Sequence, residues 1–153
     1  MKIGGVEVTS CEEILVLPRP EGTPDIPFTA IAVSINDEFD KLVPEPAPPT
    51  VLKKGGKSVP DFNDKDYKET VKRRDSQRFA FMILKSLEPS NIEWSTVDLE
   101  KPNTWLKWDK ELKEAGLSET EINRVIATVM AANSLDEDKI DAARKNFLLG
   151  QGE

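Results

Sequence analysis

Proline is distributed unevenly along this chain, and its distribution limits where long helices can form. Nine of the eleven prolines lie between Pro18 and Pro60, and only Pro89 and Pro102 follow them. A proline inside a helix removes a backbone hydrogen bond and clashes with the preceding turn. We therefore expect strands and turns before residue 60 and helices after it.

Three short segments of the first part have the composition of β-strands. Residues 2–8 and 13–17 are rich in Val, Ile and Leu, and residues 28–35 alternate as a strand with one buried face does. We expect them to form a small antiparallel β region within residues 1–43. Residues 44–60 combine prolines with a Lys-Lys-Gly-Gly-Lys turn, which is typical of a linker or an extended arm. A proline-rich ligand for an SH3-like groove is the alternative.

The remaining residues, 61–153, have the pattern of four helices joined by short turns. Asp64 has the position of an N-cap for the first helix, and Pro89 follows the end of that helix. The second helix is expected to carry Trp105, Trp108 and Leu112, and the Ala-Gly dipeptide that follows is a stop signal.

Two capping-box spacings introduce the last two expected helices. Ser118 and Glu121 precede apolar residues at i, i+3, i+4, i+7 and i+8, which is the pattern of one buried face. Ser134 and Glu137 repeat the spacing before the final helix. The sequence therefore predicts an α+β protein with a proline-rich linker and a C-terminal four-helix bundle, and we expect the bundle to fold without the N-terminal region.

Composition removes several classes of function. The 153 residues include no histidine, which excludes imidazole catalysis and histidine-ligated metals. A net charge of −7 argues against a protein that binds duplex DNA through a basic face. No apolar run approaches the length of a membrane span, and residues 1–10 lack the apolar centre of a signal peptide. We therefore expect a cytoplasmic protein.

No catalytic, cofactor-binding or metal-binding residues are predicted. The carboxylates within 61–66 and 136–141 lack the EF-hand pattern, and the Lys-Gly-Gly-Lys segment lacks the spacing of a phosphate-binding loop. We therefore expect a protein that is not an enzyme. Two groups of side chains could carry an interaction with another molecule. They are the basic residues Lys72, Arg73, Arg74 and Arg78, and the aromatic residues Trp94, Trp105 and Trp108.

Each group also has a structural explanation. The basic residues could form a solvated helix face paired with Glu69 and Asp75, which is commoner than contact with nucleic acid. The tryptophans occur at helical spacing beside leucines, and residues in this pattern more commonly pack in the core. Both alternatives stay open at the level of the sequence.

Rather more than half of the chain, residues 67–151, resembles a known family. The segments that carry the resemblance are Leu87-Glu88-Pro89, Pro102 with Trp105 and Trp108, Ala115-Gly116-Leu117-Ser118, Glu121-Ile122-Asn123-Arg124, Ala132-Asn133-Ser134-Leu135, and Ala143-Arg144 before Phe147-Leu148. These segments are similar to those of the tail assembly chaperones of tailed bacteriophages. The match is one of helical pattern and not of a catalytic signature.

The resemblance implies a mostly helical, self-associating protein of the host bacterial cytoplasm. Such a chaperone coats the phage tape-measure protein and brings tail-tube subunits to it during tail morphogenesis. Two other classes stay open: a structural virion protein of the tail or neck whose extended arm reaches its neighbours, and a small phage protein that binds a host factor.

Overall fold

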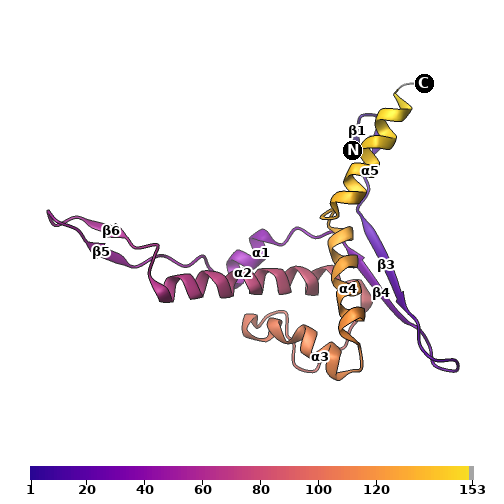
Figure 1. Cartoon of the computed structure of the whole chain (residues 1–153), viewed down its shortest axis with the longest axis horizontal. Helices are drawn as coiled ribbons and strands as arrows, with labels where there is room; N and C mark the ends of the chain where they lie inside the picture. The colour runs from indigo at the N-terminus through magenta and orange to yellow at the C-terminus, as the bar shows by residue number, and fades with distance from the viewer. Residues whose placement is uncertain (152–153) are drawn as a thin grey trace.

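The computed structural model describes residues 1–151 and has a mixed α+β fold (Figure 1). The strands are β1 Lys2–Ile3, β2 Val6–Glu7, β3 Glu12–Leu17, β4 Ile26–Ile31, β5 Thr50–Leu52 and β6 Ser58–Pro60. The helices are α1 Asn36–Leu42, α2 Lys65–Ser86, α3 Trp108–Glu114, α4 Glu119–Ala132 and α5 Glu137–Gly150, with 3-10 turns η1 Glu88–Ser90 and η2 Pro102–Lys107. The last two residues of the expected helical region, 152 and 153, lie outside the described residues.

The hairpin of β3 and β4 is the part of the sheet structure that enters the core. The two strands pair antiparallel with Leu15 opposite Phe28, and one face buries Leu17, Phe28 and Ala30. This confirms the expected antiparallel β region. The strand expected at residues 2–8 is instead a separate hairpin of β1 and β2, all of whose residues are exposed.

An aromatic cluster from three elements forms the centre of the molecule. Phe39 of α1, Phe81 of α2 and Trp105 of η2 are all fully buried. The rings of Phe81 and Trp105 stack with their centroids 4.5 Å apart, and Phe39 lies 6.1 Å from each. The indole N–H of Trp105 donates to the carbonyl of Asp98 at 3.1 Å, so the buried ring leaves no polar group unpaired.

Side chains, and not a third strand, cover the outer edge of β4. The Ser90 hydroxyl donates to the Thr29 carbonyl and accepts from the Thr29 N–H, both at 2.8 Å. The fully buried Ser86 hydroxyl donates to the Ile31 carbonyl at 2.7 Å. These bonds attach the hairpin to the end of α2 and to η1, because backbone groups at a buried strand edge need partners.

Residues from both sides of the expected boundary at residue 60 share one core. Leu17, Phe28 and Phe39 belong to the same buried cluster as residues of α2, η2, α3 and α4. The N-terminal region therefore supplies part of the packing that the helices need. The expectation that the helices fold without it conflicts with this shared core.

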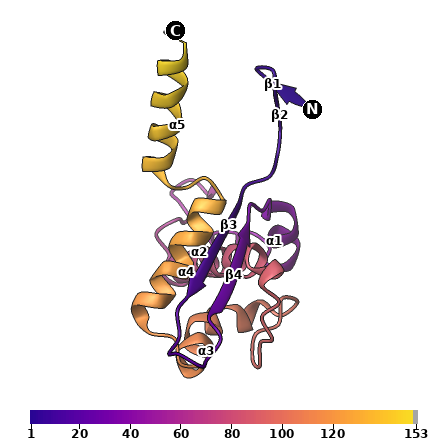
Figure 2. The same ribbon diagram turned by 90° about the vertical axis from the view of Figure 1, so that its right-hand side faces the viewer.

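The structure does not confirm the four-helix bundle. The helices α2, α3 and α4 contribute side chains to the core, whereas α5 buries none of its residues and projects away from the body (Figure 2). The place expected for a fourth helix in the core is taken by the β3–β4 hairpin, which packs against α4. The apolar stripe of α5 has no partner within the described residues.

The junction between α4 and α5 explains the direction of α5. Ser134 has a left-handed backbone with φ of +57°, and its N–H donates to the carbonyl of Ala131 at 3.1 Å. The N–H of Leu135 donates to the carbonyl of Met130 at 2.9 Å. These two bonds are a Schellman motif, which ends α4 and turns the chain away.

One of the two expected capping boxes is wrong. Asp136, and not Ser134, is the N-cap of α5, because its carboxylate accepts from the N–H groups of Asp138 and Lys139. The box of Ser118 and Glu121 at the start of α4 is confirmed. The cap at Asp64 before α2 is confirmed as well, since its side chain accepts from the N–H of Tyr67.

The expected linker, residues 44–60, contains a hairpin of β5 and β6 in which Val51 pairs with Val59. With the first turns of α2 it forms an arm that extends from the body at the left of Figure 1. The valine at position 51 and its neighbour Leu52 are exposed. Within the described residues, no helix has both the length and the apolar character needed to cross a membrane.

The shared core predicts that residues 61–153 alone do not fold cooperatively. Without Leu17, Phe28 and Phe39, the helices lose buried contacts of large side chains, each worth several kcal/mol. Thermal melting followed by circular dichroism should show a broad, non-cooperative transition. Residues 10–153 are the control, because residues 1–9 are all exposed, and their melt should stay cooperative. A sharp melt of residues 61–153 would contradict the prediction.

Removal of the buried Ser86 hydroxyl should destabilise the protein. Ser86→Ala leaves the Ile31 carbonyl and the Asn133 amide without this partner, which costs about 1–3 kcal/mol. Ser76→Ala is the matched control: Ser76 is exposed on the same helix, and its change should stay within about 0.5 kcal/mol. Urea denaturation measures both, and equal effects would count against the role of Ser86.

Candidate protein-binding groove

A shallow apolar groove lies between α2 and α4. Its central hollow, of about 270 Å³, is lined by Ile35, Asp75, Arg78, Phe79, Met82, Met130 and Leu135. Phe79 and Leu135 are 40% and 51% exposed, so the groove presents large apolar side chains to solvent. We call this surface the α2–α4 groove.

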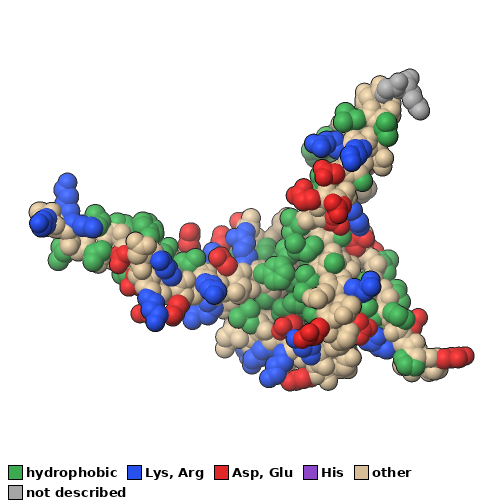
Figure 3. Space-filling view, viewed as in Figure 1, with side chains coloured by type: hydrophobic (Ala, Val, Ile, Leu, Met, Phe, Trp, Pro, Cys, Tyr) green, Lys and Arg blue, Asp and Glu red, His purple; other side chains and the backbone are tan. Residues whose placement is uncertain are grey.

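The groove continues at both ends into neighbouring hollows. One, of about 490 Å³, shares Ile35, Arg78, Met82 and Leu135 with the central hollow. The other, of about 540 Å³, shares Asp75 and Phe79 and extends to Leu106, Trp108 and Ile126. Figure 3 shows apolar side chains gathered over the crossing of α2 and α4 at the centre of the molecule.

The sequence of α2 explains why apolar side chains reach solvent here. Residues 79–84 are six consecutive apolar residues, and a helix distributes such a run around most of its circumference. Phe81 and Leu84 point into the core and are buried, whereas Phe79 is exposed and Met82 is half-buried. A run that is wider than one face therefore supplies both the core and the groove.

The charges at the rim of the groove are mostly acidic. Asp75 borders two of the hollows, and Asp109 borders the hollow at the Trp108 end. Arg78 is the one cation among the residues that line these hollows; its guanidinium donates to the side-chain oxygen of Asn36, a neutral group, and keeps its charge. The guanidinium carbon of Arg78 also lies 5.9 Å from the centroid of the Phe39 ring. With Asp37 of the first neighbouring hollow, the groove has three carboxylates against one cation, so a basic ligand meets a rim that is acidic overall.

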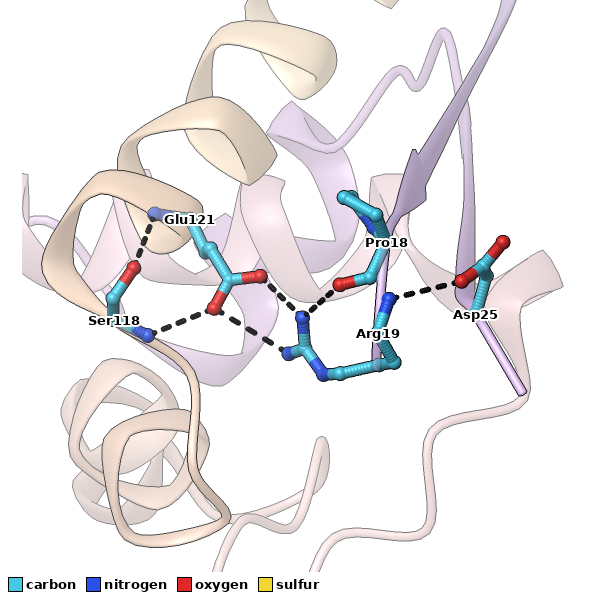
Figure 4. A network of polar contacts seen from close by, with 5 residues as sticks. All are labelled: Pro18, Arg19, Asp25, Ser118 and Glu121. Atoms are coloured by element: carbon cyan, nitrogen blue, oxygen red, sulfur yellow. Dashed lines mark hydrogen bonds and ion pairs between the residues drawn. The ribbon is translucent and has the colours of Figure 1, made fainter. Parts of the chain in front are cut away.

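A polar network fixes the start of α4, the helix that forms one wall (Figure 4). Arg19, just beyond β3, contacts the Glu121 carboxylate through two nitrogens at 2.6 and 3.4 Å. The same guanidinium donates to the Pro18 carbonyl, and the Arg19 N–H donates to Asp25. Glu121 also accepts from the backbone N–H of Ser118. The network joins the β3–β4 hairpin to α4.

Arg19 lowers the pKa of Glu121 below its ordinary value of 4.5, mainly through the hydrogen bond between the two side chains. The hydrogen bond from the Ser118 backbone acts in the same direction, and desolvation opposes both. The carboxylate is therefore held ionised in the folded protein.

The three tryptophans do not form an exposed recognition surface. Trp105 is fully buried, Trp108 is 6% exposed, and Trp94 is half-buried against the core. Trp108 nonetheless forms part of the floor at one end of the groove. The packing interpretation fits these positions.

The basic residues of α2 separate into two pairs. Arg74 lies 4.8 Å from the Phe39 ring centroid, contacts Asp40 at 2.6 Å and donates to the Val43 carbonyl. Arg74 and Arg78 therefore hold α1 against α2, and Arg74 pairs with Asp40 and not with Glu69 or Asp75. Lys72 and Arg73 are exposed.

Sequence reasoning did not identify the groove as a site. Phe79, Met82, Met130 and Leu135 line the groove but are not among the interaction residues that the sequence indicates. The sequence feature that indicates such a groove is the run of six apolar residues at 79–84, because one buried face of a helix cannot accommodate all six side chains. The groove has the chemistry of a surface that binds an amphipathic helix, and its methionines can adapt to differently shaped side chains.

Comparison with protein-family models, with curated proteins and with solved structures found no match. Among residues 1–151, no three or more Cys, Asp and Glu residues are grouped in a way that could hold a metal ion.

The lowered pKa of Glu121 predicts an acid-dependent loss of stability. The folded pKa lies below that of the unfolded chain, so the Arg19 contact stabilises the fold fully above about pH 4.5. That contribution is lost as the pH falls from this value through the folded pKa. Urea midpoints of the wild type and Glu121→Gln should therefore differ most at neutral pH and converge in acid.

Glu119→Gln provides the matched control for this measurement. Glu119 lies on the same first turn of α4, and its carboxylate is 84% exposed and 3.5 Å from Lys113. Its midpoints should follow those of the wild type at every pH. A difference between the wild type and Glu121→Gln that does not change with pH would exclude the ionised pair as its cause.

Proposed function

We propose that this protein is a non-enzymatic tail assembly chaperone of a tailed bacteriophage. It acts in the host bacterial cytoplasm and binds the phage tape-measure protein and tail-tube subunits during tail morphogenesis. The α2–α4 groove is the observation that carries the proposal, and the resemblance of residues 67–151 names the family.

The shape of the groove suits a helical client better than a small molecule. Three connected hollows form an elongated surface, and Phe79, Leu106 and Leu135 expose 40–51% of their area along it. An amphipathic helix places apolar side chains at i, i+3, i+4 and i+7 into such a groove. The tape-measure protein, as the resemblance implies, is a long helical client of this kind.

The chemistry of the groove also suits temporary binding. Met82 and Met130 are flexible, polarisable side chains that fit several sequences without a specific pocket for each. A chaperone that covers a long client needs many weak contacts whose combined strength comes from multivalency. It then has to leave when the tail tube replaces it.

A structural virion protein is the second candidate, and one observation favours it. The hairpin of β5 and β6 extends well away from the body and carries exposed Val51 and Leu52. Such an arm suits permanent attachment to a neighbouring subunit. Quantitative mass spectrometry of purified mature particles separates the candidates, since a chaperone is absent and a structural protein is present in fixed stoichiometry.

Substitution in the groove should weaken binding of the tape-measure protein. We expect Phe79→Ser/Leu106→Ser to reduce complex formation with the co-expressed tape-measure protein by at least about tenfold, because large apolar anchors dominate such interfaces. Ile14→Ser/Val16→Ser is the matched control, since these residues are exposed apolar side chains on the outer face of β3. Affinity purification with quantification of the tape-measure protein measures the effect.

Two outcomes would contradict the proposal. Equal recovery of the tape-measure protein with both double variants would exclude the groove as its binding site. No complex with the wild type at any concentration would remove the tape-measure protein as the client. Thermal melts of each variant establish that the fold is retained.

A further inference from the structure

We infer that α5 of a second copy of this chain occupies the α2–α4 groove when no client is bound. The inference concerns the same groove as the proposed function and names the occupant before a client arrives. It is tested on the protein alone, so it can fail independently of the proposed client.

The first observation is that α5 has an apolar face without a partner. Ile140, Ala143 and Phe147 lie at i, i+3 and i+7, and all are exposed, with Phe147 at 65%. A helix of 14 residues is only marginally stable in water without packing. The helix therefore needs a surface that covers this stripe.

The second observation is that α5 cannot fold back onto its own α4 while the junction keeps its structure. The Schellman motif at Ser134 ends α4 and directs the chain outward. Lys139 of α5 contacts Glu13 of β3 at 2.9 Å, and Cys11 lies 3.8 Å from the Ser134 hydroxyl. These contacts hold the start of α5 against the start of β3, so an α5 helix that lies in the groove has to come from another molecule.

The third observation is complementary charge. The stripe of α5 is flanked by Arg144, whose side chain is 71% exposed and lies 3.7 Å from Asp141 one turn earlier on the same helix. The hollows of the groove carry the carboxylates of Asp37, Asp75 and Asp109 against one cation, Arg78, so the rim is acidic overall. A docked α5 can therefore place Arg144 against an acidic rim.

The sequence predicts a four-helix packing within one molecule. Such an exchange would form this packing between two molecules instead. The fourth helix of the expected bundle would lie beside α2 and α4, contributed by the neighbour. Exchange of a terminal element is a common route to association, because the element carries a surface that already fits the fold. A reciprocal exchange would fill both grooves and double the contact.

The test compares two substitutions on opposite faces of α5. Phe147→Asp lies in the stripe, whereas Leu149→Asp lies on the opposite face of the helix and makes the same change of an exposed apolar residue to Asp. Sedimentation equilibrium of the full chain should show self-association in the micromolar range. Phe147→Asp should weaken it at least about tenfold, and Leu149→Asp should leave it within about twofold of the wild type.

A cross-linking experiment identifies the surface that α5 contacts. In chains with Cys11→Ser, one population carries Phe147→Cys and the other carries Phe79→Cys, and the two are mixed and oxidised. We expect a covalent dimer that joins the two populations. Leu149→Cys with Phe79→Cys is the control pair and should give little product.

Four results would overturn the inference. The first three are a wild type that is monomeric up to about 1 mM, an association that Phe147→Asp does not weaken, and cross-linking of Phe79→Cys that is equal with both α5 positions. The fourth comes from hydrogen exchange, which detects closure within one chain. Strong protection of α5 in a verified monomer would place the helix in its own groove and exclude exchange.

Discussion

The outer edge of β4 depends on side chains for its hydrogen bonds, and the arrangement of the helices depends on that edge. A two-stranded hairpin is not stable alone in water, so β3 and β4 require a surface to pack against. The hairpin is attached to such a surface by the side chains of Ser86, Ser90 and Asn133. The Asn133 amide accepts from the Val33 N–H at 2.9 Å and donates to the Ser86 hydroxyl. The ends of α2 and α4 are thereby fixed to one strand, and the β3–β4 hairpin takes a place in the core beside the helices.

The sequence predicts local structure well where a capping residue and an apolar period agree. Asp64 and Ser118 mark helix starts that the structure confirms, and the antiparallel pair of β3 and β4 lies within the β region expected for residues 1–43. Ser134 shows the limit of such reasoning. The same residue type can cap a following helix or adopt a left-handed conformation after a preceding one, and here the second is observed. The neighbouring Asp136 is the better N-cap.

Tertiary packing is harder to predict from the sequence than local structure. Periodicity shows that one face of a helix is apolar, but it does not show which part of the protein covers that face. The stripe of α5 has the spacing of a core helix, yet all of it is exposed. Phe81 and Phe39 were not identified as core residues, although with Trp105 they form its centre. Periodicity could not distinguish the groove and the stripe from core surfaces. Each is an apolar surface that the rest of the same chain does not cover. Their fit to one another is the reason to consider a second copy.

The arm of β5 and β6 has a further consequence for how the molecule behaves at high concentration. A projecting two-stranded hairpin has two open edges, and such edges can recruit strands from other chains into aggregates. Pro60 lies within β6 and has no N–H to offer, Pro49 directly precedes β5, and Lys53, Lys54 and Lys57 surround the tip. Prolines and repelling charges both discourage edge-to-edge pairing. The arm can therefore reach outward and touch other molecules through its side chains while resisting uncontrolled fibril growth.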